Sequence, residues 1–278
     1  MAERDVRGAI IGRLEAAGVP APAADARWLL AHANAGGTLD HDQLEALVVR
    51  REHHEPLQLI LGSWPFRTVE LSLDAGVFLP RPETEVVAGV AIDHALRLGP
   101  GAVVAEPCTG SGAIACSLLA EVPGVRVIAT DLDPTAVALA RRNLATVDPH
   151  GDAQVLTGDL LEPLPAALRG HLDVLVANPP YLPSDERGQL PREVVEHDPQ
   201  TALFGGEDGH EVVDALLAAA AGWLRPGGVV ILELDERRGA DAVEVARRLG
   251  LAEVQLIPDL AGRDRAIVAS IPAVPVCP

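Results

Sequence analysis

Apolar residues recur every three or four positions along the first sixty residues of the chain. Val6 and Ile10 illustrate this spacing, which is the period of an amphipathic helix. The predicted helices cover residues 5–18, 22–37 and 40–54. Glycines follow the first two helices, and Asp40 or Asp42 is placed to cap the third. We therefore expect a small helical bundle at residues 1–62.

Between residues 63 and 79 apolar and polar positions alternate, as at Val69 and Leu71. Alternation with a period of two is typical of a strand or a hairpin, and the sequence Asp-Ala-Gly at 74–76 predicts a turn. We interpret this stretch as a β-hairpin linker. It connects the helical bundle to a larger domain that we expect at residues 80–278.

The larger domain begins with a helix expected after Pro82 and then alternates short apolar runs with helical patterns. The expected strands cover 102–107, 125–131, 153–159, 172–180, 229–235, 252–260 and 265–271, and the expected helices cover 111–122, 134–147, 211–228 and 239–250. This order predicts an α/β fold with a Rossmann-like, doubly wound, mostly parallel sheet. Only four residues separate the last two strands, so we expect an antiparallel pair at one edge.

Composition narrows the possible partners. The 278 residues are 48% hydrophobic and carry a formal net charge of −18, and every basic residue is an arginine. A protein that binds a duplex needs cations against the phosphates, and these arginines are scattered beside acids, so nucleic acid is disfavoured. The sequence contains no apolar run long enough to span a membrane and no apolar core of a secretion signal. We therefore expect a cytoplasmic protein that has no membrane partner, with Cys108, Cys116 and Cys277 reduced.

The first strand of the larger domain leads into a glycine loop, "EPCTGSGAIA" at 106–115. Gly110 and Gly112 allow the backbone to approach a ligand closely, but this loop alone fits NAD, FAD, S-adenosylmethionine or only a tight turn. Asp131 ends the second strand, where an acid can accept both hydroxyls of a ribose. Asp133 is better placed to cap the next helix, and Asp159, after the third strand, is placed to meet an adenine amino group.

The fourth strand ends in Asn178-Pro179-Pro180-Tyr181. Adjacent prolines remove two backbone donors and fix two φ angles. The Asn178 side-chain oxygen and the Pro179 carbonyl can accept from a planar, weakly basic nitrogen, and Tyr181 can pack on its flat face. Such acceptors direct the lone pair toward a methyl donor and stabilise the developing charge. The motif favours a methyltransferase that needs no metal, over a nicotinamide oxidoreductase or a non-catalytic binding module.

Several segments together resemble one known family, the class I S-adenosylmethionine-dependent methyltransferases that modify the glutamine side-chain amide of peptide chain release factors. The segments are "EPLQLILGSWPF", "GVFLPRPETE", "CTGSGAIA", "NPPY", "EHDPQTALFGGEDG", "LRPGG" and "DLAGRDR". They span nearly the whole chain, and the run Pro-Arg-Pro-Glu-Thr-Glu is highly specific.

The resemblance implies that the protein binds S-adenosylmethionine and methylates a release factor. The implied cofactor-binding residues are Glu106, Cys108, Thr109, Gly110, Ser111, Gly112, Asp131, Leu132, Asp159, Leu160 and Asn178. The residues implied to hold the substrate amide are Asn178, Pro179, Pro180 and Tyr181. The N-terminal helices would help to dock the release factor, whose Gly-Gly-Gln loop enters the pocket.

The chain departs from the family pattern at a few positions. Glu106 stands in place of the usual Asp, Leu160 in place of a frequent aromatic residue, Leu59 in place of Tyr and Arg67 in place of Gly. The changes at 59 to 67 touch the region expected to choose the substrate.

These departures keep a second acceptor class open: a small cationic metabolite, such as arginine or another guanidine or amine. Its pocket would need acids near Tyr181, for which Glu193, Glu196 and Asp198 are the candidates.

Overall fold

The N-terminal helices form a bundle with its own core. The computed structural model describes residues 3–148 and 151–273. The bundle helices are α1 (Glu3–Ala16), α2 (Pro22–Ala33), α3 (His41–Glu52) and the short α4 (Leu57–Leu61). Leu14, Leu29 and Val48 are buried at its centre. The three predicted helices are confirmed, and Asp40 caps α3 by accepting from the backbone N–H of Gln43 at 2.9 Å.

The hairpin consists of β1 (Ser63–Phe66) and β2 (Val69–Ser72). The chain does turn at 74–76, as predicted, but the hairpin itself reverses at residues 67–68. Arg67 adopts a left-handed φ of 49° there, a conformation that disfavours side chains by about 1–2 kcal/mol. Its guanidinium donates to both carboxylate oxygens of Glu121 at 2.8 and 2.7 Å. This ion pair ties the hairpin to the larger domain.

The larger domain contains a seven-stranded sheet in the order β5-β4-β3-β6-β7-β9-β8. Its strands are β3 (Val103–Pro107), β4 (Arg126–Asp131), β5 (Ala153–Thr157), β6 (Leu172–Ala177), β7 (Leu224–Glu233), β8 (Ala252–Pro258) and β9 (Asp264–Ser270). The strands from β5 to β7 are parallel, whereas β9 runs antiparallel to both β7 and β8. The predicted mostly parallel sheet with an antiparallel edge pair is confirmed.

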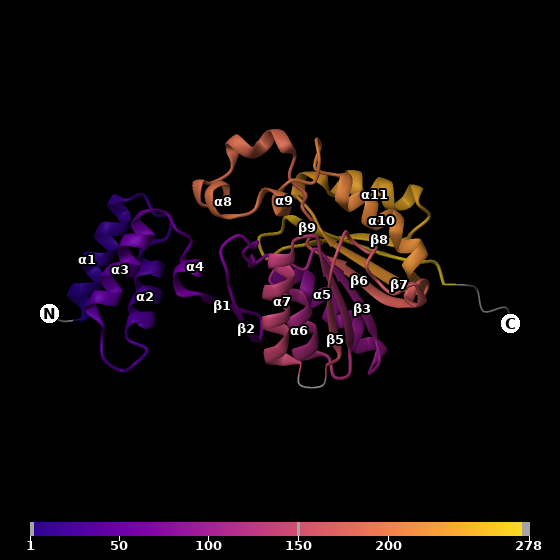
Figure 1. The fold of residues 1–278 in the computed structure, drawn as a ribbon. Helices are drawn as coiled ribbons and strands as arrows, with labels where there is room; N and C mark the ends of the chain where they lie inside the picture. The colour runs from indigo at the N-terminus through magenta and orange to yellow at the C-terminus, as the bar shows by residue number, and fades with distance from the viewer. Residues whose placement is uncertain (1–2, 149–150, 274–278) are drawn as a thin grey trace.

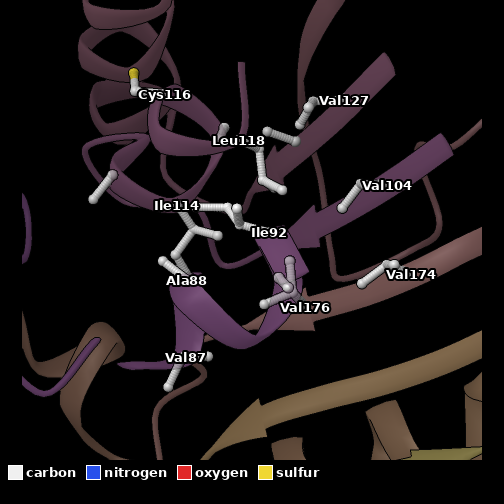
Figure 2. Packing of buried hydrophobic residues seen from close by; sticks show 14 of the residues in the cluster. Val87, Ala88, Ile92, Val104, Ile114, Cys116, Leu118, Val127, Val174 and Val176 are labelled. Carbon is white, nitrogen blue, oxygen red and sulfur yellow. The ribbon is translucent and has the colours of Figure 1, made fainter. Parts of the chain in front are cut away.

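Helices cover both faces of this sheet (Figure 1). One face packs against α5 (Thr84–Leu98), α6 (Ala113–Glu121) and α7 (Pro134–Val147), and the other packs against α10 (Glu211–Trp223) and α11 (Gly239–Arg248). In the first layer, Val87 and Ile92 of α5 pack with Val104 and Val174 of the sheet (Figure 2). Burial on both faces explains why the strands are continuous apolar runs.

Two further regions differ from the sequence-based expectation. The helix expected over 211–228 ends at Trp223, because Leu224 already pairs with Leu172 and begins β7. No element was predicted between 181 and 210, where the structure has η2 (Ser184–Gln189), α8 (Arg192–His197) and α9 (Gln200–Leu203). These short elements carry too few periodic apolar positions to be recognised in the sequence.

The remaining short elements are η1 (Ala166–Leu168) and η3 (Glu236–Arg238). Within 3–148 and 151–273, no helix combines the length and apolar character needed to cross a membrane. Cys108 and Cys116 are free thiols, and Cys277 lies outside the described residues.

Candidate active site

A cavity of about 540 Å³ lies at the carboxyl ends of the parallel strands. After β3 the chain continues to β4 on one side, and after the neighbouring β6 it continues to β7 on the other side. The cavity therefore lies at the topological switch point of the sheet. Open α/β sheets bind their ligands at such a point. The predicted site residues that line it are Glu106, Cys108, Thr109, Gly110, Ser111, Asp131, Leu132, Asp159, Leu160, Asn178 and Pro180.

Glu106 provides a buried acid at the end of β3. The residue is only 2% exposed, and burial raises the pKa of its carboxyl to about 8. Its Oε2 atom and the hydroxyl of Thr109 have no hydrogen-bond partner among the described residues. A buried polar atom without a partner is unfavourable, so both groups are suited to a polar ligand. A cationic ammonium would favour the ionised carboxylate.

The glycine loop between β3 and α6 is built from left-handed conformations. Cys108, Gly110 and Gly112 have φ angles of 59°, 55° and 81°. A methyl group on Gly112 would lie 3.3 Å from the backbone of Ala140, so this glycine permits close packing of α6 against α7. Gly112 does not itself line the cavity.

Asp131 holds the same loop from the end of β4. Its Oδ2 atom accepts from the backbone N–H of Gly110 at 2.8 Å, and its Oδ1 atom accepts from that of Asp133 at 3.0 Å. Burial raises the pKa of Asp131. Asp133 caps α7 by accepting from Thr135 at 2.7 Å, as predicted.

The part of the cavity lining that follows Asp131 is partly apolar. Leu132 is 64% exposed although it is a large hydrophobic residue beside the cavity. Leu160 has a left-handed φ of 42°, and its carbonyl accepts from the Thr130 hydroxyl at 2.5 Å. Together with Asp159, these residues form a surface that suits a flat ring bearing an amino group.

Asn178 lies at the end of β6, where Thr84 fixes its amide. The Asn178 Nδ2 atom donates to the Thr84 hydroxyl at 3.1 Å. Thr84 is itself buried. Burial raises the pKa of Glu233 to about 7, and the hydrogen bond between Glu233 and the Thr84 side chain partly counteracts this rise. Since the Nδ2 side of the amide is occupied, the side-chain oxygen of Asn178 is the group left to accept a ligand N–H.

The structure does not bring all of the predicted residues to the cavity. Pro179 and Tyr181 are absent from the described residues that line it. Tyr181 packs in the core on the α10 face of the sheet, and its hydroxyl donates to Glu233 at 3.3 Å. These contacts fix the aromatic ring of Tyr181.

The cavity also contains residues that sequence analysis did not assign to the site. The segment after the hairpin contributes Phe78, Pro80 and Thr84, and the segment after α8 contributes Pro199, Thr201, Ala202 and Phe204. The first group belongs to the Pro-Arg-Pro-Glu-Thr-Glu region, whose specificity was a usable signal. The second group lies in the segment "EHDPQTALFGGEDG", which carries part of the family resemblance although its hydrophobic pattern predicts no helix or strand.

The acids considered for a cationic metabolite are paired with arginines. Glu193 lies 2.7 Å from Arg51 and Glu196 lies 2.8 Å from Arg192, while Asp198 forms an ion pair with Arg81. None of the three acids lines the cavity formed by the described residues. Their arrangement gives no support to a pocket for a small cation.

The doubly wound sheet, the glycine loop and the polar groups at the strand ends define a class I methyltransferase. Residues 95–207 match the Methyltransferase small domain family. The fold is shared with a methyltransferase from Pyrococcus furiosus, at a TM-score of 0.55 and 20% identity over 83% of this chain and 98% of that one.

The chain belongs to the family of release factor glutamine methyltransferases. It is 41% identical over 268 residues to the release factor glutamine methyltransferase of Streptomyces coelicolor, covering 91% of this chain and 92% of the relative. It is 38% identical over 279 residues to that of Deinococcus radiodurans, covering 96% and 97%. The resemblance inferred from the sequence motifs is thus confirmed.

Proposed function

We propose that this protein transfers a methyl group from S-adenosylmethionine to the glutamine side-chain nitrogen in the Gly-Gly-Gln loop of a peptide chain release factor. The observation that carries the proposal is the fixed amide of Asn178 at the cavity, whose oxygen is left to accept an N–H. Relatives that cover nearly the whole chain are release factor glutamine methyltransferases.

The residues around the cavity fit the cofactor. The partnerless carboxylate oxygen of Glu106 suits the ammonium of its methionyl part, and Asp131 suits the ribose hydroxyls. Leu132, Asp159 and Leu160 suit the adenine. When bound, the cofactor supplies an electrophilic methyl group on a sulfonium sulfur. The protein then contributes binding, orientation and electrostatics.

An amide nitrogen is a poor nucleophile because its lone pair is delocalised into the carbonyl group. An acceptor such as the Asn178 oxygen, placed at its N–H, holds the nitrogen in position and stabilises the positive charge that develops as the new bond forms. One preorganised hydrogen bond of this kind contributes about 3–4 kcal/mol to lowering the barrier. Pro179 and Tyr181 do not line the cavity, so Asn178 is the residue of the motif to which we assign the contact with the amide nitrogen.

We propose that substrate docking and methyl transfer are carried out by different parts of the chain. Residues 1–62 dock the release factor, 63–79 form a linker, and 80–278 bind the cofactor and carry out the transfer in the cytoplasm. The separate core of the bundle supports this division. Trp64 of the hairpin packs against both that core and the core of the larger domain, and its ring lies 5.2 Å from that of Trp28.

The test is methylation of a purified release factor with cofactor labelled in the methyl group. We expect one label on the glutamine of the Gly-Gly-Gln loop, located by mass spectrometry. In Asn178→Ala, turnover should fall by about 100-fold or more, while the cofactor dissociation constant stays within a factor of about three. Tight cofactor binding without label on that glutamine refutes the substrate, and full turnover by Asn178→Ala refutes the role of Asn178.

A further inference from the structure

The segment that contains α8 and α9 forms one wall of the cavity. Pro199, Thr201, Ala202 and Phe204 line the cavity from this segment. At its C-terminal end the segment is held to the motif after β6, because the N–H of Leu182 donates to the carbonyl of Leu203 at 2.9 Å. The position of this wall therefore determines the shape of the cavity.

The α8–α9 segment has little intrinsic stability of its own. The two helices have six and four residues, and isolated helices of that length are unstable in water. In α8 no residue is fully buried. Tertiary anchors must therefore keep the segment in place.

One anchor comes from the segment that follows the hairpin. Asp198, between α8 and α9, forms an ion pair with Arg81 and accepts from the backbone N–H of Leu79 at 3.4 Å. Asp198 is 6% exposed. Leu79 and Arg81 lie in the segment after the hairpin, which also lines the cavity, so this anchor joins two parts of the cavity lining.

A second anchor comes from the N-terminal bundle. Arg51 of α3 is 4% exposed, and its Nη1 atom lies 2.7 Å from the carboxylate of Glu193 in α8. The same guanidinium donates to Asp25 of α2 at 2.7 Å and to the carbonyl of Glu55 at 2.8 Å. Asp25 and Glu55 fix Arg51 within the bundle, so Glu193 reaches a rigid cation.

We propose that Glu193 is a positioning residue through which the bundle holds the α8–α9 wall in the shape needed for methyl transfer. The inference rests on the proposed function for the identity of the substrate, but not for the contact itself. Asp25 keeps the charge of Arg51 compensated when Glu193 is removed, so the bundle stays folded while the wall loses its link to it.

The test compares Glu193→Ala with Glu196→Ala, a matched control in the same helix. Both changes remove one carboxylate from an ion pair, but the partner of Glu196 is Arg192, which is exposed and belongs to α8 itself. Glu193→Asp keeps the charge on a shorter side chain. Hydrogen exchange is followed over residues 192–204 and over α1 to α3, and kcat and KM are measured with a release factor.

In Glu193→Ala we expect amide exchange over 192–204 to accelerate about tenfold, as after loss of one partly buried ion pair. Exchange in α1 to α3 and the melting temperature should stay unchanged. KM for the release factor should rise by a similar factor with a smaller change in kcat. Glu193→Asp should lie between Glu193→Ala and the wild type, and Glu196→Ala should match the wild type.

Unchanged exchange over 192–204 overturns the proposal, as does equal acceleration in Glu196→Ala. Faster exchange throughout the bundle also overturns it, because Glu193 would then be a stabilising residue of the bundle. Accelerated exchange over 192–204 in a protein that labels no release factor supports the positioning role and refutes only the proposed substrate.

Discussion

Replacing Glu106 by glutamine tests the burial of an acid at the centre of the site. Glutamine has nearly the shape of the protonated carboxyl but cannot ionise. Burial raises the pKa of Glu106 from the ordinary value of 4.5 to about 8. Between these two values the folded protein binds a proton that the unfolded chain releases, so the wild type loses stability as the pH rises.

The expected size follows from this pKa. The loss amounts to about 1.4 kcal/mol for each pH unit between 4.5 and 8, which gives about 3 kcal/mol at pH 7 and about 5 kcal/mol above pH 8. Below pH 4.5 the effect is absent. Glu233, another buried acid, is present in both proteins, so its contribution cancels in the difference, whereas the charge of Asp131 itself raises the pKa of Glu106 and is part of the effect.

Urea denaturation at pH 5, 7 and 9 measures this difference. We expect Glu106→Gln to gain about 4 kcal/mol relative to the wild type between pH 5 and pH 9. In calorimetric titrations the same variant should bind S-adenosylmethionine more weakly, and wild-type affinity should rise as the pH approaches 8. Glu196→Gln, at the exposed surface, is the control. A stability difference that does not change with pH would show that burial does not raise the pKa of Glu106.

Two further changes test the support of the site. Thr84→Val removes the acceptor for the Asn178 amide, so kcat should fall about tenfold in steady-state assays. Thr84→Ser keeps the hydroxyl and should stay near the wild type. Equal rates for the two variants would contradict the proposed orientation of Asn178. Gly112→Ala places a methyl group 3.3 Å from Ala140 at a φ of 81°, and chemical denaturation should show a loss of about 1–3 kcal/mol. Gly110→Ala has no neighbour within 4 Å and should lose less.

The convergence of residues at the strand ends could be predicted because parallel strands all finish at one edge of a sheet. Glu106, Asp131 and Asn178 each follow a recognisable apolar run, so the sequence alone places them together. The glycine loop was also recognisable in the sequence, because glycines directly before a helix indicate a tight turn or a close backbone approach to a ligand.

The remainder of the site depends on contacts between residues far apart in the sequence. Arg81 and Asp198 are 117 positions apart, and no periodicity relates them. The hydrogen bond between Tyr181 and Glu233 requires β6 beside β7 in one particular register. That information lies in tertiary packing, so the wall of the cavity and the surroundings of Tyr181 had to be observed.

The place of β9 in the sheet has a consequence for synthesis on the ribosome. β9 lies between β7 and β8 but follows both in the chain, so a nascent chain that has produced β8 still exposes one unpaired edge of β7. Open edges of this kind invite pairing with other chains. The nascent protein is therefore still vulnerable to aggregation in the interval before residues 264–270 emerge, after every predicted site residue has already been made.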